Sequence, residues 1–151
     1  MHERISQQAV YQYCPRLAEH LLALGKTDTN AQITSGIIHL VKLRVSQING
    51  CGFCQHMHSA EARKDGERQE RLDVLPAWRE LACFTPPERA ALAWAEATTL
   101  ISQQAVNDAT YQNAVTHFGE AGLIELTTVI LEINSWNRIS VSLQFQPAIA
   151  D

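Results

Sequence analysis

A short turn between two helical patterns constrains the fold of this chain more than any other feature. Before the turn, apolar residues over positions 33–47 repeat at three- and four-residue steps, which indicates a largely buried helix: Ile37, Leu40, Val41 and Val45. Asn49-Gly50 is a good helix stop. The next helix is expected to begin at or near Cys51 and to run to about Gly66. Because almost no chain joins them, the two helices should form a tight helical hairpin.

Helical spacing continues on both sides of this hairpin. Apolar residues over 10–24 predict a helix, in which Pro15 marks either a break or a start. Thr85-Pro86-Pro87-Glu88 has the form of a capping box and opens a predicted helix that runs to about Ile101. Short helical turns are expected over 67–74 and 76–81.

The C-terminal third is also helical by pattern. A helix is predicted over 109–118, closed by Gly119, and a long apolar pattern follows over 122–145 and ends at Pro147. Apolar residues on several faces of this last segment predict a central helix, or one shared with another subunit. We find no convincing strand, repeat or linker, so the prediction is one all-α domain over residues 1–151.

The composition is that of an ordinary globular chain. With 46% hydrophobic and 19% charged residues, 151 residues can build one core. The net charge of -4 is spread along the chain without a basic block, which argues against nucleic acid and anionic membranes as partners. The polar N-terminus lacks the pattern of a signal peptide, and no stretch approaches the ~18 uninterrupted apolar residues of a membrane span. A soluble, cytoplasmic protein is therefore expected, in which a close cysteine pair is catalytic or metal-binding.

The candidate chemistry is concentrated in Cys51-Gly52-Phe53-Cys54. Cysteines three residues apart at the start of a helix lie on one face, near disulfide distance, and the helix dipole there favours a thiolate. His58 follows Cys54 by one turn and is a plausible acid/base partner, directly or through a water. His39 should be nearly level with His58 across the hairpin. The dipole favours Cys51 as nucleophile and the histidine favours Cys54, so the pattern leaves the attacking sulfur open.

Other interpretations of these residues are a pair of buried structural thiols and a zinc site. The zinc site would use Cys51, Cys54 and His58 with His39 or His56, which is a chemically adequate set, but one crowded onto a single helical face. His56 points away from His58 and is expected to be exposed. The two remaining cysteines, Cys14 and Cys83, have no partner at a useful spacing and are predicted to be small core residues.

The residues of the hairpin resemble those of a known family. The run 40–54 with Met57-His58-Ser59, together with the segments 85–92 and 133–138, is similar to alkylhydroperoxidase D-like (AhpD-like) proteins of the carboxymuconolactone decarboxylase-like superfamily. The resemblance covers most of the chain. It implies an AhpD-like helical bundle with the CxxC pair at the N-terminus of a central helix, and assembly into a trimer or hexamer. We expect neither a cofactor nor a metal.

The resemblance also implies an activity, namely reduction of an organic hydroperoxide or hydrogen peroxide by a dithiol. It assigns Cys54 as the peroxidatic cysteine, Cys51 as the resolving one and His58 to a proton relay. An external dithiol of lipoyl or thioredoxin type would then reset the pair. Relatives usually carry a glutamate twelve residues before the first cysteine, and this chain has His39 there, so the relay contains an imidazole.

Two other functions are compatible with the pattern. One is cofactor-free decarboxylation of a lactone, as elsewhere in the superfamily, although that chemistry does not need a dithiol. The other is a non-catalytic oligomer in which the cysteine pair senses redox state. Consumption of peroxide with a dithiol separates the peroxidase from both.

Overall fold

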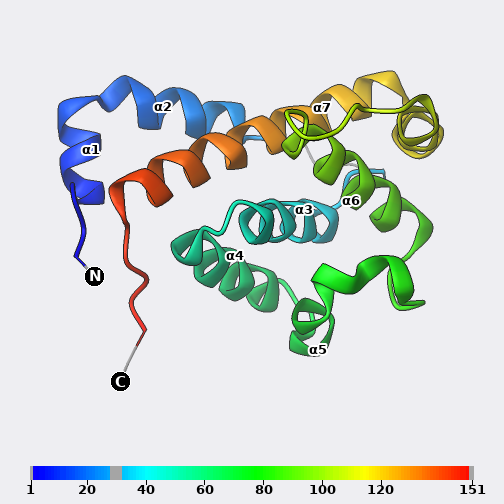
Figure 1. Cartoon of the computed structure of the whole chain (residues 1–151), viewed down its shortest axis with the longest axis horizontal. Helices are drawn as coiled ribbons and strands as arrows, with labels where there is room; N and C mark the ends of the chain where they lie inside the picture. Colours follow the sequence, from blue (N-terminus) through cyan, green and yellow to red (C-terminus); the bar gives the residue numbers. More distant parts are fainter. Residues whose placement is uncertain (1, 28–31, 150–151) are drawn as a thin grey trace.

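Helices account for the regular structure in the computed structural model, which describes residues 2–27 and 32–149; within them there is no strand (Figure 1). The helices are α1 (Gln7–Tyr13), α2 (Pro15–Leu24), α3 (Ser35–Ile48), α4 (Gly52–Lys64), α5 (Gln69–Asp73), the 3-10 helix η1 (Leu75–Glu80), α6 (Pro86–Thr99) and α7 (Asp108–Leu143). The all-α prediction and the α3–α4 hairpin are confirmed. The polar residues over 26–30 indicate a loop, and part of this segment lies outside the described residues.

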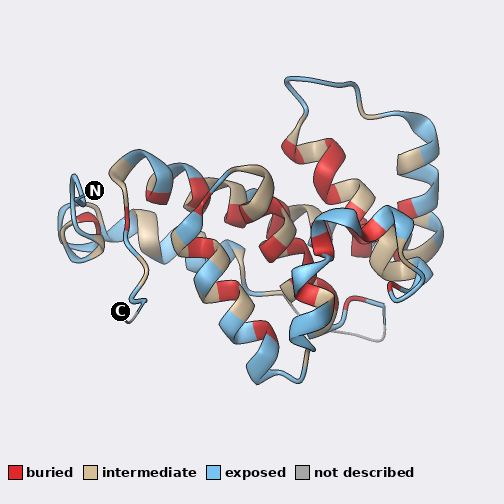
Figure 2. Ribbon diagram, turned by 60° about the horizontal axis from the view of Figure 1, so that its bottom comes forward, coloured by how far each residue is buried: buried red, intermediate tan, exposed pale blue. Residues whose placement is uncertain are grey.

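Helix α3 lies at the centre and packs against α4, α6 and α7 (Figure 1). Its two sides belong to different core clusters. Val41 and Val45 pack with α4, α6 and α7, whereas Leu40 and Leu43 pack against the segment that contains α5 and η1. A helix buried on two sides needs apolar residues on both, which explains the broad apolar stripe of positions 33–47. Buried residues accordingly follow the inward faces of the helices (Figure 2).

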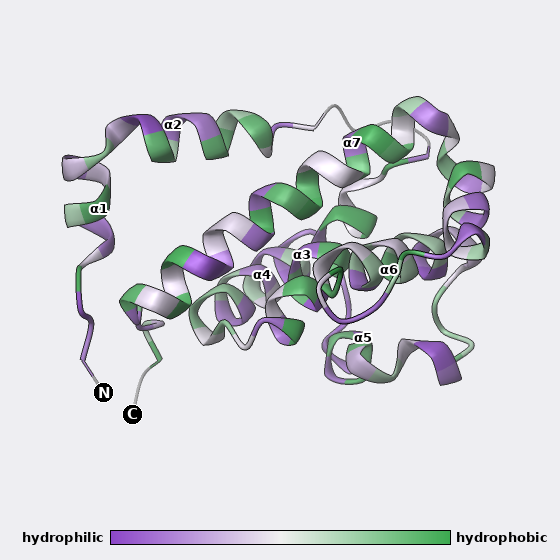
Figure 3. Cartoon of the chain, turned by 45° about the horizontal axis from the view of Figure 1, so that its top comes forward, coloured by the Kyte–Doolittle hydropathy of each residue, from purple (hydrophilic) through white to green (hydrophobic). Residues whose placement is uncertain are grey.

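Helix α7 is interrupted at one residue, Gly119. Its φ of +66° and ψ of 173° turn the chain between two helical segments, as the sequence predicts. A side chain would be strained at that φ, so glycine suits the position. By length and composition α7 also resembles a membrane-spanning helix, a test that core helices pass too. It packs against α2, α3, α4 and α6, and its ribbon alternates between hydrophilic and hydrophobic residues along its length (Figure 3), so we interpret it as a core helix.

Helix ends follow the cap residues of the sequence. The capping box at α6 is confirmed: the Glu88 amide donates to Thr85 Oγ1 at 3.4 Å, and the Thr85 amide donates to Glu88 Oε2 at 2.7 Å. The first predicted helix is two helices, because Pro15 starts α2. The C-terminal end was predicted too late: α7 ends at Leu143, and Gln144 stops it by adopting a left-handed conformation with φ of 59°.

A buried carboxylate joins α6 to its neighbours. Glu96 accepts hydrogen bonds from Trp78 Nε1 at 3.0 Å, from Arg44 Nε at 2.7 Å and from Arg79. Burial would raise the pKa of Glu96, but these hydrogen bonds and the nearby Arg44 charge outweigh it and lower the pKa below its ordinary value. This carboxylate therefore ties α3, η1 and α6 together as an ion.

One core prediction was wrong. Cys83 is exposed because it lies in the turn between η1 and α6, outside any helix, and Cys14 is only half-buried at the junction of α1 and α2.

Candidate active site

The turn between α3 and α4 reverses the chain within a few residues. Asn49 caps the end of α3, Gly50 has a φ of +66°, and Cys51 is the N-cap of α4. The positive φ is the reason that a glycine is needed in this turn. The Cys51 amide donates to the Ser46 carbonyl at 2.9 Å, which holds the cysteine against the last turn of α3.

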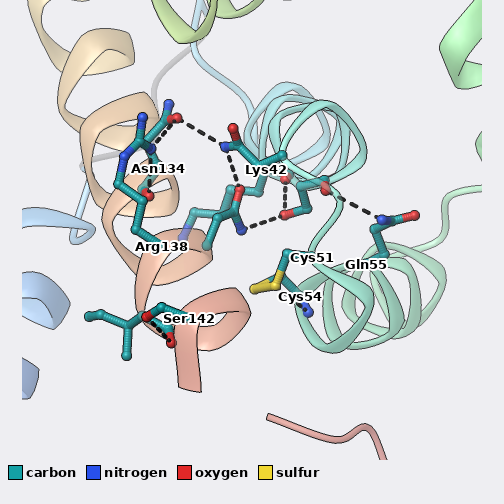
Figure 4. Close-up of a disulfide and its surroundings, with 11 residues drawn as sticks. Lys42, Cys51, Cys54, Gln55, Asn134, Arg138 and Ser142 are labelled. Atoms are coloured by element: carbon teal, nitrogen blue, oxygen red, sulfur yellow. Dashed lines mark hydrogen bonds between the residues drawn. A yellow bond between two sulfur atoms is a disulfide. The ribbon is translucent and has the colours of Figure 1, made fainter. Parts of the chain in front are cut away.

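Cys51 and Cys54 are joined by a disulfide (Figure 4). Their Cα atoms are 5.3 Å apart, and each residue is 1% exposed. The Cys54 amide donates to Cys51 Sγ at 3.2 Å, so the sulfur of Cys51 takes the place of the usual N-cap oxygen. In the reduced protein, this hydrogen bond and the helix dipole favour a thiolate at Cys51.

Three asparagines hold the turn against α7, and we refer to Asn49, Asn134 and Asn137 as the asparagine clamp. Asn49 Nδ2 donates to Asn134 Oδ1 at 3.0 Å and to Asn137 Oδ1 at 2.9 Å (Figure 4). Asn137, which is fully buried, donates in turn to Ser46 Oγ at 3.1 Å. Since Ser46 also accepts from the Cys51 amide, the clamp fixes the position of the dithiol relative to α7.

His58 is buried one helical turn beyond Cys54, as its spacing predicts. Its Nδ1 lies 2.8 Å from Glu61 Oε2. The hydrogen bond from His58 lowers the pKa of Glu61, partial burial opposes the shift, and the charges of His58, Lys42 and His39 add to the lowering. Glu61 is therefore a carboxylate at neutral pH. With Nδ1 donating to it, the neutral imidazole keeps Nε2 as its basic atom.

His39 comes to the second arm of the hairpin, where it pairs with a carboxylate. Its Nε2 lies 2.8 Å from Oδ2 of Asp65, the residue that caps the end of α4, and its Nδ1 is buried without a hydrogen-bond partner. Within residues 2–27 and 32–149, no group of three or more His, Cys, Asp or Glu side chains is arranged to hold a metal ion. His56 is exposed, as predicted.

Cys54 and His58 both line a cavity of about 210 Å³, the Cys54 cavity. Its charged lining residues are Lys42, Glu61 and Glu132, and Lys42 Nζ lies 3.0 Å from Glu132 Oε2. Its remaining lining is mainly apolar and aromatic: Tyr11, Leu22, Phe53, Met57, Trp136 and Phe145, with Gln7 and Ser140. The cavity therefore brings one cysteine, one histidine and a charged cluster beside an apolar surface.

The charged residues of this cavity were not among the candidates predicted from the sequence. Glu61 had a local signal, because a carboxylate three residues after a helical histidine lies on the same face. The pair formed by Lys42 and Glu132 joins α3 to α7 and has no such signal, because the two residues are far apart in the chain.

Comparisons with known proteins agree with the fold and the motif. Residues 15–97, more than half of the chain, match the model of the carboxymuconolactone decarboxylase family. The uncharacterized protein YdfG of Bacillus subtilis is 38% identical over 143 residues, which are 95% of each chain.

Two solved structures extend the comparison. The first, ATU0492 of Agrobacterium tumefaciens, is a protein of unknown function described as a candidate antioxidant defence protein AhpD. It is 33% identical, with a TM-score of 0.87 over 99% of this chain and 100% of its own. The debrominase Bmp8 is 18% identical, with a TM-score of 0.76 over 92% of this chain and 75% of its own, a likeness of fold alone. On the family match, the YdfG identity and the ATU0492 structure together, this chain belongs to the carboxymuconolactone decarboxylase family and is an AhpD-like member of it.

Proposed function

We propose that this protein is a thiol-dependent peroxidase that reduces an organic hydroperoxide or hydrogen peroxide through the Cys51–Cys54 pair. One observation carries the proposal: Cys54 lines the same cavity as the buried His58, which is paired with Glu61, and a disulfide joins Cys54 to a second cysteine. A nucleophile, a base and a resolving thiol are the groups that the reaction requires.

In the proposed first step, His58 Nε2 takes the proton of the Cys54 thiol, and the thiolate attacks one peroxide oxygen. The O–O bond breaks, Cys54 becomes a sulfenic acid, and the leaving alkoxide or hydroxide takes the proton from the imidazolium. Glu61 keeps the imidazole oriented and favours its charged form during the transfer.

In the second step, the Cys51 thiolate attacks the sulfur of the Cys54 sulfenic acid. The S–O bond breaks, water leaves after protonation, and the disulfide forms. The hydrogen bond from the Cys54 amide stabilises the attacking thiolate before this step. An external dithiol then reduces the disulfide. A dithiol cycle of this kind suits a reducing compartment, so the proposal places the protein in the cytoplasm.

For His39 we propose a positioning role. Its charge lowers the pKa of Glu61, and its hydrogen bond to Asp65 holds it on α4. It therefore acts through Glu61, at the position where relatives carry a glutamate.

Assembly into a trimer or hexamer is part of the proposal. Ile124 and Leu131 are exposed apolar residues seven positions apart, so they lie on one face of α7, which a second copy would cover.

Peroxide consumption tests the proposal. With dithiothreitol as the reductant, wild type should consume cumene hydroperoxide catalytically, and Cys54→Ser should not. Cys51→Ser should complete a single turnover, and Cys83→Ser, at an exposed cysteine, should match wild type. Full turnover by Cys54→Ser would refute the assignment. A change of oligomeric state on oxidation without turnover in wild type would favour a redox-sensing function instead.

A further inference from the structure

The two cysteines of the disulfide line different cavities. Cys54 lines the Cys54 cavity, whereas Cys51 lines a second one of about 300 Å³, the Cys51 cavity, which lies between the start of α4 and the end of α7. Its lining residues are Gly50, Cys51, Gly52, Phe53, Ser140, Val141, Gln144, Phe145, Gln146 and Pro147. Phe53, Ser140 and Phe145 line both cavities and so form their shared boundary. The two phenylalanine rings pack edge to face with centroids 5.6 Å apart.

The cavities differ in charge. The Cys54 cavity contains two carboxylates, Glu61 and Glu132, and one ammonium group, that of Lys42, so its field is negative when His58 is neutral. None of the residues that line the Cys51 cavity carries a charge. A hydroperoxide is neutral and is not repelled by the Cys54 cavity. A reducing thiolate is an anion, and the two carboxylates disfavour its approach there.

The direction of attack also separates the two sulfurs. A thiolate attacks one sulfur of a disulfide and expels the other, approaching from the side away from the leaving sulfur. Cys51 lines a cavity that Cys54 does not line, so an attack on Cys51 from that cavity is the approach we consider. We propose that the Cys51 cavity is the docking site of the external reductant, a dithiol without charged groups near its sulfurs, and that this reductant reaches the disulfide separately from the peroxide. This inference rests on the proposed peroxidase function.

The reduction then runs in two balanced steps. The reductant thiolate attacks Cys51 Sγ, the disulfide bond breaks, and Cys54 leaves as a thiolate, which takes a proton. The second thiolate of the reductant attacks its own sulfur in the mixed disulfide and expels the Cys51 thiolate, which takes the other proton. The reductant is oxidised to its disulfide. The hydrogen bond from the Cys54 amide to Cys51 Sγ makes Cys51 a good leaving group in the second step.

The lining indicates the chemistry of the ligand. Gln144, Gln146 and Ser140 offer amide and hydroxyl groups, and Val141, Pro147 and the two phenylalanines offer apolar contact. A small neutral dithiol fits such a surface. Glutathione carries two carboxylates and an ammonium group, for which the lining provides no charged partner.

Two variants test the docking site by filling it. Val141 is exposed and lines the Cys51 cavity. It lies roughly 80° around α7 from Leu131 by the helical repeat, and so off the face proposed for assembly. Val141→Trp should slow reduction of the disulfide by dithiothreitol about tenfold or more. The control is Asn113→Trp, at an exposed position of α7 that lines neither cavity, and it should not slow the reduction. Gln146→Trp, on the exposed segment after α7, is a second filling variant that does not alter a helix and should also slow the reduction.

The half-reactions are measured separately, by acid quenching and counting thiols by mass spectrometry. Oxidation of the reduced Val141→Trp protein by cumene hydroperoxide should remain within about twofold of wild type, because Val141 does not line the Cys54 cavity. Met57→Trp, in the Cys54 cavity, should slow the peroxide step more than the reduction. The docking site would be overturned if both Val141→Trp and Gln146→Trp were reduced at the wild-type rate. It would also be overturned if Met57→Trp slowed the reduction more than the peroxide step.

A third measurement does not depend on peroxide. In Cys54→Ser, neutral iodoacetamide should alkylate Cys51 about tenfold more slowly when Val141→Trp is added; in Cys51→Ser, the same addition should leave alkylation of Cys54 unchanged. Equal rates at Cys51 with and without Val141→Trp would overturn the proposed access. If neither wild type nor any variant reacts with peroxide, the proposed peroxidase function is wrong. Reduction of the disulfide by dithiothreitol and alkylation of Cys51 still test the docking site in that case.

Discussion

Replacement of Asn137 by alanine tests whether the asparagine clamp holds the dithiol in place. Asn137 is fully buried, accepts a hydrogen bond from Asn49 and donates one to Ser46. The variant loses both. Asn49 still donates to Asn134, and the Ser46 hydroxyl still donates to the Lys42 carbonyl, so neither partner is left without a hydrogen bond. The loss is therefore two ordinary hydrogen bonds and a small cavity.

Each of these hydrogen bonds contributes about 1 kcal/mol to the free energy of unfolding, and the cavity adds about 1 kcal/mol. We therefore expect Asn137→Ala to lower this free energy by about 3 kcal/mol. Urea unfolding of the oxidised protein, followed by circular dichroism, measures the change. The control is Asn113→Ala, at an exposed position of the same helix, which should differ from wild type by less than about 0.5 kcal/mol.

The clamp also makes a kinetic prediction. Ser46 accepts from the Cys51 amide, so loss of Asn137 should loosen the turn and speed reduction of the disulfide by dithiothreitol. An Asn137→Ala protein as stable as the Asn113→Ala control, with an unchanged reduction rate, would refute the view that the clamp positions the dithiol.

Three further predictions concern ionisable groups. Because the folded-state pKa of Glu96 lies below its ordinary 4.5, its stabilisation is complete above that value and is lost as the pH falls through the lowered pKa. The free energy of unfolding, measured in urea titrations, should thus decline in that acid range. Glu96→Gln leaves the Arg44 charge without its partner, so it should lower this free energy by about 3 kcal/mol near pH 7 and make the acid decline less steep. His58→Gln should slow sulfenic acid formation about 10²-fold or more in rapid-quench experiments, and Glu61→Gln should slow it by less, since Glu61 acts through the imidazole. His39→Gln should shift the pH profile of the peroxide step and change its maximum rate by less than about tenfold, as expected of a group that acts on Glu61 by charge; a loss equal to that of His58→Gln would contradict this role.

Local patterns in the sequence predict much of the fold and part of the site. The α3–α4 hairpin follows from the apolar spacing over 33–47 and the Asn49-Gly50 stop, and the register of His58 with Cys54 follows from the helical repeat. The capping box at Thr85 and the break at Gly119 also depend on neighbouring residues alone. Such features are predictable because the interacting groups lie within a few residues of one another.

Features that depend on distant residues were not predictable in this way. The clamp joins Asn49 to Asn137 across 88 positions, and only the packing of α3 on α7 brings the two together. The separation of the two sulfurs into different cavities requires Phe145, which follows the unexpected left-handed turn at Gln144. Pairing of His39 with Asp65 depends on the length of α4, which the sequence defines only to within a few residues.

The most direct test of the central claim is the identity of the sulfur that peroxide oxidises. Reduced Cys51→Ser protein is treated with one equivalent of cumene hydroperoxide in the presence of dimedone, and the adduct is located by peptide mass spectrometry. Because Cys54 lines the cavity that contains His58, we predict a stoichiometric sulfenic acid adduct on Cys54 and none on Cys51 in the matched Cys54→Ser protein. Rapid labelling of Cys51 in Cys54→Ser, with no label on Cys54 in Cys51→Ser, would contradict the account.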